Sequence, residues 1–266
     1  MRQLLFLLIL ILSAGCKQGL KTEHYTIGLD PYWYPLELAG QEKPLLAFTI
    51  ELFATIAKKE NLELSIVYMN WDNLLEGLRK KQYSGAASSL PPYIFNLDKY
   101  SFSDPFLLTG PVLVVPMKSK IKNVTQLKGK EIGIVPRSSA TLILQTYPDV
   151  ILRAFDSIPL ALDGLFKQQV DASVLNVLIT QKYIRNLWSK QLKIASNPLS
   201  DEGVRLLTLR GDHPELHIRF NRGLKKLQKK GTYKKLLDKW GLSPDGKEVK
   251  DIDKKLQALI IKYVKS

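Results

Sequence analysis

The fold class is decided by the stretch Tyr25-Thr26-Ile27-Gly28-Leu29, which reads as a short apolar strand, and by the pattern that follows it. Apolar residues recur at three- and four-residue spacing over residues 47–60, which predicts a helix, and they alternate with polar residues over 62–67, which predicts a strand. A second helical stripe over residues 71–78 leads to a strand of small residues at 83–88. Strands that alternate with helices in this way favour a parallel sheet covered by helices, so we expect an α/β fold.

A second α/β unit follows with the same alternation. Apolar runs rich in β-branched residues predict strands at residues 112–115, 131–135 and 170–175. Helices are predicted to begin near Ser138 and to cover residues 158–168, where leucine and phenylalanine form a stripe at helical spacing. The chain therefore has enough elements for two α/β lobes.

The C-terminal part carries the clearest helix signals. Asp212 is predicted to cap a helix, with Glu215 three residues later as in a capping box, and Gly231 is predicted to end it. Residues 245–266 are predicted to form an additional charged amphipathic helix. Its apolar side would carry Leu256, Leu259, Ile260 and Tyr263.

The N-terminus has the pattern of an export signal. A cation at Arg2 precedes the apolar run that begins at Leu4, small residues follow, and Cys16 is the only cysteine of the chain. The run is too short to span a bilayer, which needs about 20 residues, but it suits a signal peptide. The ending resembles the lipobox of bacterial lipoproteins. We therefore expect a signal peptide at residues 1–15 and a linker at 16–23, with lipid that includes palmitate attached to Cys16. The alternative is an uncleaved N-terminal anchor.

Composition narrows the classes of partner. The formal net charge is +14, and apolar residues make up 45% of the chain, as in ordinary globular proteins. A single cysteine excludes an internal disulfide, so the core must supply the stability of an exported chain. The basic excess could favour an anionic ligand, a lipid surface or nucleic acid, but an export signal argues against nucleic acid.

Seven short motifs in a fixed order resemble a known family, the periplasmic solute-binding proteins of ABC importers, in its polar amino-acid-binding group. The resemblance covers the chain from about Tyr25 to Leu242. The motifs are Ile27-Gly28-Leu29-Asp30 with Trp33 and Pro35; Phe48-Thr49-Ile50-Glu51-Leu52; Trp71-Asp72-Asn73-Leu74; Phe102-Ser103-Asp104-Pro105-Phe106; Leu127-Lys128-Gly129-Lys130; Val170-Asp171-Ala172; and Gly231-Thr232-Tyr233 with Lys239-Trp240-Gly241.

This resemblance implies the two-lobed periplasmic-binding-protein fold of type II, an α/β fold with the ligand cleft between the lobes. Lobe 1 would comprise residues 24–108 plus 203–242, lobe 2 residues 109–202, and residues 243–266 would be a helical extension. The two segments that cross between lobes would lie near Phe106–Pro111 and Asp201–Val204. Closure of the lobes around a solute would be the state that the transporter recognises.

The resemblance also implies a binding site, and the chain departs from it at two positions. Where the family has an arginine that grips the ligand carboxylate this chain has Asn96, with Pro91 upstream, and where it has an aspartate for the ligand ammonium this chain has Asn176. Either the ligand is not an ordinary α-amino acid, or Lys99 or Arg137 supplies the anion site instead. The candidate ligand-binding residues are Asp30, Trp33, Trp71, Ser88, Ser89, Asn96, Arg137, Ser138, Ser139 and Asn176.

Two sets of these residues have an expected physical role. Trp33 and Trp71 match positions where aromatic rings enclose a ligand, although isolated aromatics are more often core residues. Arg137 stands beside Ser138 and Ser139 at the start of a predicted helix, where free N–H groups favour an anionic part of a ligand. Ser138 could instead be only a helix cap.

The sequence thus predicts a lipid-anchored, extracytoplasmic and non-enzymatic binding protein. Its partners would be a small polar solute, an ABC permease in the inner membrane and the membrane itself. The solute would be an amino acid or a related anionic compound. We expect no nucleic-acid partner, no cofactor and a monomer. One alternative is a sensing or adhesion protein with a diverged cleft. Another is a cyclohexadienyl dehydratase-like enzyme with Asp30 or Glu37 as its acid. His213 and His217 are four residues apart but lack a third ligand nearby, so we expect no metal site.

Overall fold

The computed structural model of the chain describes residues 23–244 and 246–264. The expected signal peptide, Cys16 and all but the last residue of the expected linker lie outside the described residues. Among the helices that are described, none is long and apolar enough to cross a membrane.

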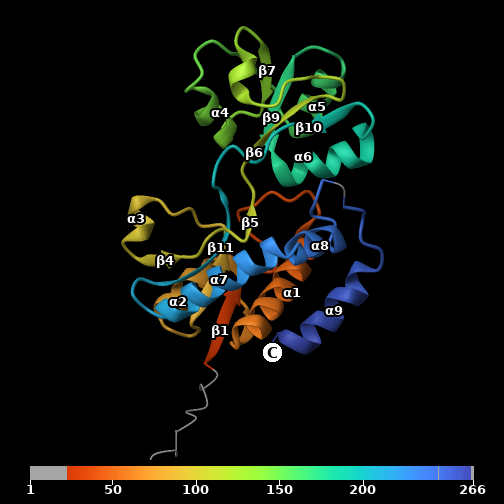
Figure 1. Cartoon of the computed structure of the whole chain (residues 1–266). Coiled ribbons are helices and arrows are strands. Elements are labelled where there is room, and N and C mark those ends of the chain that lie inside the picture. Colours follow the sequence, from red (N-terminus) through yellow and green to blue (C-terminus); the bar gives the residue numbers. More distant parts are fainter. Residues whose placement is uncertain (1–22, 245, 265–266) are drawn as a thin grey trace, which may run out of the picture.

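Two lobes, each built on one sheet, make up the described chain (Figure 1). In the first lobe the strand order is β2-β1-β3-β11-β4, and β5 pairs with β11. β1 is parallel to β2 and β3, whereas β11 is antiparallel to β3, β4 and β5. The bounds are β1 His24–Leu29, β2 Glu63–Tyr68, β3 Gly85–Ser88, β4 Tyr100–Phe102, β5 Leu107–Leu108 and β11 Gly203–Leu209.

The parallel sheet expected for the strands near residues 25–29, 62–67 and 83–88 is confirmed, because β1 is parallel to both β2 and β3. The antiparallel strand β11 was not part of that prediction. β11 enters the sheet on the chain's return from the second lobe, and not after a covering helix, so no strand–helix–strand crossover imposes a parallel direction.

The second lobe has a five-stranded sheet with the order β10-β6-β9-β7-β8. β7 is parallel to β8 and β9, while β6 is antiparallel to β9 and β10. The bounds are β6 Pro111–Pro116, β7 Glu131–Ile134, β8 Ile151–Ala154, β9 Ala172–Asn176 and β10 Leu192–Ile194. This α/β arrangement places the carboxyl ends of β7 and β9 toward the first lobe.

Helices cover both sheets. Those of the first lobe are α1 Glu42–Glu60, α2 Trp71–Arg79, α3 Ile94–Leu97, α7 Pro214–Lys229, α8 Thr232–Lys239 and α9 Ile252–Tyr263. Those of the second lobe are the short 3₁₀ turn Val124–Leu127, α4 Ser139–Leu144, α5 Ile158–Phe166, α6 Val177–Tyr183 and the π-helical turn Ile184–Trp188 that continues α6.

An aromatic cluster lies at the centre of the first lobe's core. The rings of Phe53 and Phe220 are 5.0 Å apart and those of Phe53 and Phe106 are 5.2 Å apart, each pair edge to face. All three side chains are fully buried. The same buried cluster continues into the second lobe through Val112 and Leu178, so the two lobes share one continuous apolar core.

The C-terminal segment packs on the first lobe. α9 lies along α1, and Leu256 is buried while Leu259, Ile260 and Tyr263 pack against the core, as the sequence predicts for that face (Figure 1). Val264 forms a parallel bridge with Ile66 on the edge strand β2. The segment thus covers an edge that would otherwise be open to other chains.

Two helix starts differ from the sequence-based prediction. α1 begins at Glu42 and not at 47, because Pro44 fits the first turn, where a helix needs no N–H donor. Asp212 does not cap α7: His213 precedes the helix with a φ of 51°, and the Asp212 carboxylate instead lies 2.9 Å from the Lys81 ammonium.

A buried carboxylate ties α1 to α7. Glu60 accepts hydrogen bonds from Arg222 Nε at 2.6 Å and Lys226 Nζ at 2.8 Å. Burial alone would raise the Glu60 pKa, but the bonds from these two cations outweigh it and hold the pKa below its usual value.

The two segments that cross between the lobes are paired with each other. Val204 lies opposite Leu107, Gly203 lies opposite Leu108, and the Thr109 N–H donates to the Glu202 carbonyl at 2.8 Å. At Gly203 a Cβ would lie 2.4 Å from the Leu107 carbonyl oxygen, so only glycine allows this close approach. The lobes are thus joined by a short two-stranded ribbon.

α6 and its π-helical turn make a second connection between the lobes. Gln181 donates to the Leu242 carbonyl at 2.8 Å, and Gln41 donates to the Leu178 carbonyl at 2.9 Å. Arg185 donates to the carbonyls of Gly241 and Gly246 at 3.0 and 2.8 Å. Side-chain to backbone hydrogen bonds therefore hold the second lobe against the first at a point away from the ribbon.

Candidate functional site

Two adjoining cavities lie between the lobes beside the ribbon. The larger, of about 720 Å³, has Glu37 and its neighbours on the first lobe and Arg137, Asp156 and Asn176 on the second. The smaller, of about 490 Å³, lies against the ribbon itself. Pro35 and Leu36 contribute to both, so the two cavities form one cleft with walls from both lobes.

Five of the ten candidate ligand-binding residues line this cleft. Arg137, Ser138 and Asn176 line the larger cavity, and Ser89 and Ser139 line the smaller one. Four of these five come from the second lobe, at or just after the carboxyl ends of β7 and β9. Strand ends of this kind are where open α/β sheets bind ligands.

The polar side chains of the second lobe are already bonded within the protein. Ser138 Oγ donates to the Val135 carbonyl at 2.6 Å, so Ser138 does not cap α4 with its hydroxyl. Ser139 Oγ donates to the Glu202 carboxylate at 3.0 Å, across to the returning segment of the ribbon. Both residues present these internally bonded hydroxyls at the cleft wall.

Asn176 has a local role that the sequence did not predict. Its side-chain oxygen accepts from the Leu178 N–H at 3.1 Å and caps α6, while its amide donates to the Thr109 carbonyl at 3.0 Å. A neutral amide can do both at once, whereas an aspartate cannot donate. Asparagine at this position therefore serves the junction of α6 with the ribbon.

In the first lobe, Asp30 and Trp33 are buried outside the cleft lining. The Asp30 carboxylate accepts from the N–H groups of Tyr32 and Tyr34, each at 3.0 Å, and so fixes the turn after β1. Trp33 is 2% exposed with a φ of 61°, and its Nε1 has no hydrogen-bond partner among the described residues.

The remaining three candidates also lie outside the cleft lining. Ser88 Oγ accepts from the Leu90 N–H at 3.1 Å, and the buried Asn96 donates to the Pro91 carbonyl at 2.9 Å. Trp71 begins α2 and stands 5.8 Å, centre to centre, from the ring of Tyr34. The structure therefore gathers the second-lobe candidates at one cleft and leaves most first-lobe candidates inside their own lobe.

Sequence reasoning named Arg137 as a ligand-binding residue and Glu37 only as the acid of the alternative enzyme, and it missed the other three charged residues of the cleft. Asp156 and Glu37 line the larger cavity, and Asp201 and Glu202 line the smaller one. Asp156 lies two residues after the end of β8, near the strand end where a polar residue often faces a ligand, and that signal could have identified it. Asp201 and Glu202 lie in the segment that the sequence predicts to cross between the lobes, a prediction that gives them no role in ligand binding.

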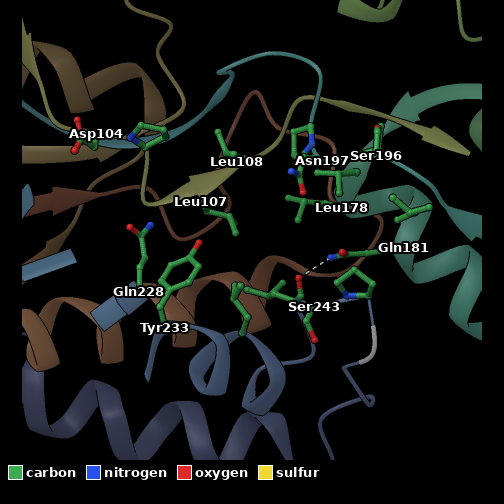
Figure 2. A pocket seen from close by; sticks show the side chains of 18 residues that line it. Asp104, Leu107, Leu108, Leu178, Gln181, Ser196, Asn197, Gln228, Tyr233 and Ser243 are labelled. Carbon is green, nitrogen blue, oxygen red and sulfur yellow. Dashed lines mark hydrogen bonds between the residues drawn. The ribbon is translucent and has the colours of Figure 1, made fainter. Parts of the chain in front are cut away.

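A third cavity, of about 550 Å³, lies between the lobes on the α8 side of the ribbon (Figure 2). Its lining is mostly apolar, with Leu107, Leu178 and Leu237 among its walls. Tyr233 faces it and donates to the Phe106 carbonyl at 2.8 Å, and burial raises the pKa of Tyr233 far above its usual value. Asp104 is its only lining carboxylate among the described residues, and Lys225 pairs with Asp104 at 3.1 Å.

The histidine pair does not form a metal centre in the described part of the chain, where no group of three His, Cys, Asp or Glu side chains could hold an ion. His217 Nε2 lies 2.9 Å from Thr208 Oγ1. Burial, with a smaller contribution from nearby His213, lowers the pKa of His217 to about 4. His213 packs edge to face against Tyr25.

Comparison with known proteins agrees with this geometry. Residues 25–243 match the family described as bacterial extracellular solute-binding proteins, family 3. The chain is 24% identical over 223 residues to the ABC transporter arginine-binding protein 1 of Escherichia coli (strain K12), covering 82% of this chain and 90% of that protein. It is 25% identical over 219 residues to the L-cystine-binding protein TcyJ of the same organism, covering 80% and 81%.

The fold has solved counterparts. The unliganded, open L-cystine solute receptor of Neisseria gonorrhoeae superposes with a TM-score of 0.66 at 19% identity, over 85% of this chain and 96% of that one. A likeness of this kind shows the fold alone, the two-lobed type II periplasmic-binding-protein fold. Because the family match covers most of the sequence as well, the chain belongs to family 3 of the bacterial extracellular solute-binding proteins.

Proposed function

We propose that the chain captures a small polar solute, an amino acid or a related compound, in the cleft between its lobes and delivers it to an ABC importer. The observation that carries this proposal is a cleft whose two cavities have walls from both lobes beside a two-stranded ribbon. A solute that touches both walls favours the closed arrangement by its extra contacts there.

The ribbon supports closure as a rotation of one lobe against the other. β5 and β11 alone form the ribbon, so a small backbone change near Thr109 and Gly203 would turn the second lobe, with a matching shift of the α6 contacts to the first lobe. Ser139 and Glu202 would approach the solute from the ribbon side, and Arg137, Ser138, Asn176 and Ser89 would form the rest of the site.

The inward-facing candidates would act behind this surface. Asp30 would hold the turn that carries Pro35 and Leu36, and Ser88 and Asn96 would position the segment around Pro91. Trp33 and Trp71 would form the wall beneath that turn. None of these roles requires bond chemistry, and we propose a binding function without catalysis.

An extracytoplasmic position on a lipid anchor at Cys16 would complete this role. A tether would hold the receptor close to a permease in the same membrane and raise its effective concentration there. The monomer would suffice, because one chain holds both cleft walls.

The test combines binding with a measurement of shape. The purified chain from residue 24 is screened against amino acids, small peptides, dicarboxylates, amines and sugars by thermal shift, because a solute bound only by the folded state raises its melting temperature. For each hit, small-angle scattering should give a smaller radius of gyration with solute than without.

Ser139→Ala should weaken every hit several-fold, and Thr146→Ala, just beyond α4 and away from the cleft, should leave affinity unchanged. If no solute in the panel binds, or if a bound solute leaves the radius of gyration unchanged, capture by lobe closure is wrong.

A further inference from the structure

The cleft carries charge of the opposite sign to the chain. Four carboxylates line its two cavities, Glu37, Asp156, Asp201 and Glu202, against one guanidinium, Arg137. Over the whole sequence the balance is reversed, with 39 lysines and arginines to 25 acidic residues. A chain of net charge +14 has therefore placed an acidic surface where its two lobes meet.

Most of this acidity is not neutralised within the protein. Asp201 pairs with buried Arg205 at 3.1 Å, and among the described residues the Glu202 carboxylate accepts only the neutral hydroxyl of Ser139. For Glu37 and Asp156 there is no ion pair among the described residues. When the paired Asp201 is left out of the count, the cleft lining still has three carboxylates and one cation.

Three hydrogen-bond donors of the second-lobe wall are already engaged within the protein. The hydroxyls of Ser138 and Ser139 and the amide of Asn176 already donate to Val135, Glu202 and Thr109. A bound carboxylate needs donors, and these three would have to break an existing bond to supply one.

Prolines remove further donors from the lining. A proline has a carbonyl to accept hydrogen bonds but no N–H to donate. The walls of the two cavities include Pro35, Pro91, Pro92, Pro136 and Pro159. Hydroxyl donors such as Tyr93 and Tyr183 remain in the lining, but the charged groups there are mainly carboxylate acceptors, which suits a ligand rich in N–H donors.

We propose that the cleft selects a solute of net positive charge, an amine or guanidine, and that the solute needs no carboxylate of its own. This inference rests on the proposed function and names the ligand class of the same site. It reverses the expectation that Arg137 and the start of α4 mark an anionic site. Arg137 is the one lining cation among the described residues, and three unneutralised carboxylates share the cleft with it.

Matched solutes separate charge from carboxylate recognition. Arginine, citrulline and agmatine share one chain length: citrulline replaces the guanidinium with a neutral urea, and agmatine lacks the carboxylate. Calorimetric titration should give agmatine an affinity equal to that of arginine within about threefold, and citrulline one at least about tenfold weaker, because a hydrogen-bonded charge is lost. 1,4-Diaminobutane tests an amine, and glutamate tests the opposite charge.

Variants test the residues. Glu202→Gln should weaken agmatine binding about tenfold, and Asp156→Asn and Glu37→Gln several-fold each, because both of those carboxylates are exposed. Asp149→Asn, an exposed carboxylate paired with Lys128 outside the cleft, is the control and should have no effect. Arg137→Gln should leave agmatine affinity unchanged or raise it, and added salt should weaken binding in the parent chain.

Two results would overturn the inference: binding of citrulline or glutamate as tightly as agmatine, or no binding of any cationic probe. If the broader screen then finds a neutral or anionic solute that closes the lobes, only the ligand class is wrong. If no solute closes them, the proposed function fails as well.

Discussion

The two lobes contribute to the cleft in different ways. In the first lobe, Asp30, Ser88 and Asn96 direct their polar atoms into their own backbone turns, and Trp33 is buried. In the second lobe, Arg137 and Asn176 stand at the ends of strands and line the cavity. The first lobe thus gives the cleft a shaped backbone surface, and the second gives it most of the exposed polar groups.

The hydrophobic cores of the two lobes also differ, in size and in how well they are covered. The first lobe has the Phe53, Phe106 and Phe220 cluster, with α9 as an additional cover along α1. The second lobe has a smaller cluster of its own around Leu127, and its edge strand β8 is exposed along its whole length. We infer that the first lobe is the stable platform and the second the part that moves.

The largest expected effect tests this difference in the cores. Phe106→Ala should lower the free energy of unfolding by about 3–5 kcal/mol, because it empties a fully buried aromatic site where the core meets the ribbon. Urea unfolding measures the loss, and Phe95→Ala, 61% exposed, is the control. Leu127→Ala should destabilise the second lobe alone, and hydrogen exchange measures this. A loss of protection shared equally by both lobes would contradict the inference that the two cores differ in stability.

A second test uses acid. His217 has a folded-state pKa of about 4 against an ordinary value of 6.5, so the folded chain resists a proton that the unfolded chain accepts. Stability is therefore unaffected above pH 6.5 and falls as the pH drops toward 4, by about 3 kcal/mol in all. His217→Gln should remove that fall when unfolding is measured across this range.

The acid effect should also be confined to one lobe. All three histidines, His24, His213 and His217, belong to the first lobe's sequence, so hydrogen exchange near pH 5 should accelerate there before it does in the second lobe. An equal acceleration in both lobes would show that acid acts through other groups.

The third test compares one polar residue from each lobe, Asp30 behind the cleft and Ser139 at its wall. Asp30→Ala removes two hydrogen bonds from backbone N–H groups to a carboxylate and should cost about 2 kcal/mol of stability, with ligand affinity changed only indirectly. Ser139→Ala should cost about 1 kcal/mol or less but weaken binding directly. Denaturant unfolding measures the stability of both variants, and calorimetric titration measures their affinity. If Asp30→Ala weakens binding directly and Ser139→Ala does not, the binding surface belongs to the first lobe.

Much of the fold could be predicted from the sequence, because its elements have a local periodic signal. Residues 158–168 and the apolar face of residues 245–266 show helical spacing, and helices form there at Ile158–Phe166 and Ile252–Tyr263. β8 and β11 lack such a signal. β8 is exposed at an edge, and β11 is defined by partners that lie far away in the sequence, which no local pattern reports.

The sequence could predict which segments lie near the cleft, but not which way their side chains point. The family's motif order located Ser139 and Asn176 at the cleft, yet it also named Asp30 and Asn96, whose side chains turn inward. Which way a side chain points depends on its bonding to neighbouring backbone, and that is a tertiary property. The acidic character of the lining was missed for the same reason, since Glu37 and Asp156 come to line one cavity only when the lobes are placed together.

The smallest expected effect concerns the contact that joins the two lobes away from the ribbon. α6 is a wall shared by two cavities: Ile179 lines the larger cleft cavity, while Leu178 and Gln181 line the third cavity (Figure 2). Arg185, in the turn that continues α6, holds this wall to the first lobe through the carbonyls of Gly241 and Gly246. Burial lowers the pKa of Arg185, with Glu248 opposing this, which indicates that the guanidinium is desolvated at this contact.

Arg185→Gln should therefore cost only about 1 kcal/mol of global stability, because the guanidinium's hydrogen bonds to two neutral carbonyls are lost and water can replace part of the interaction. Its main effect should be on lobe orientation. Scattering should give a broader distribution of particle dimensions without solute, and the solute should still close the cleft through the ribbon. Arg79→Gln, which removes an exposed pair with Glu76, is the matched control and should change neither measurement. If Arg185→Gln leaves the distribution unchanged, the ribbon alone sets the angle between the lobes, and α6 only lines the cavities on its two sides.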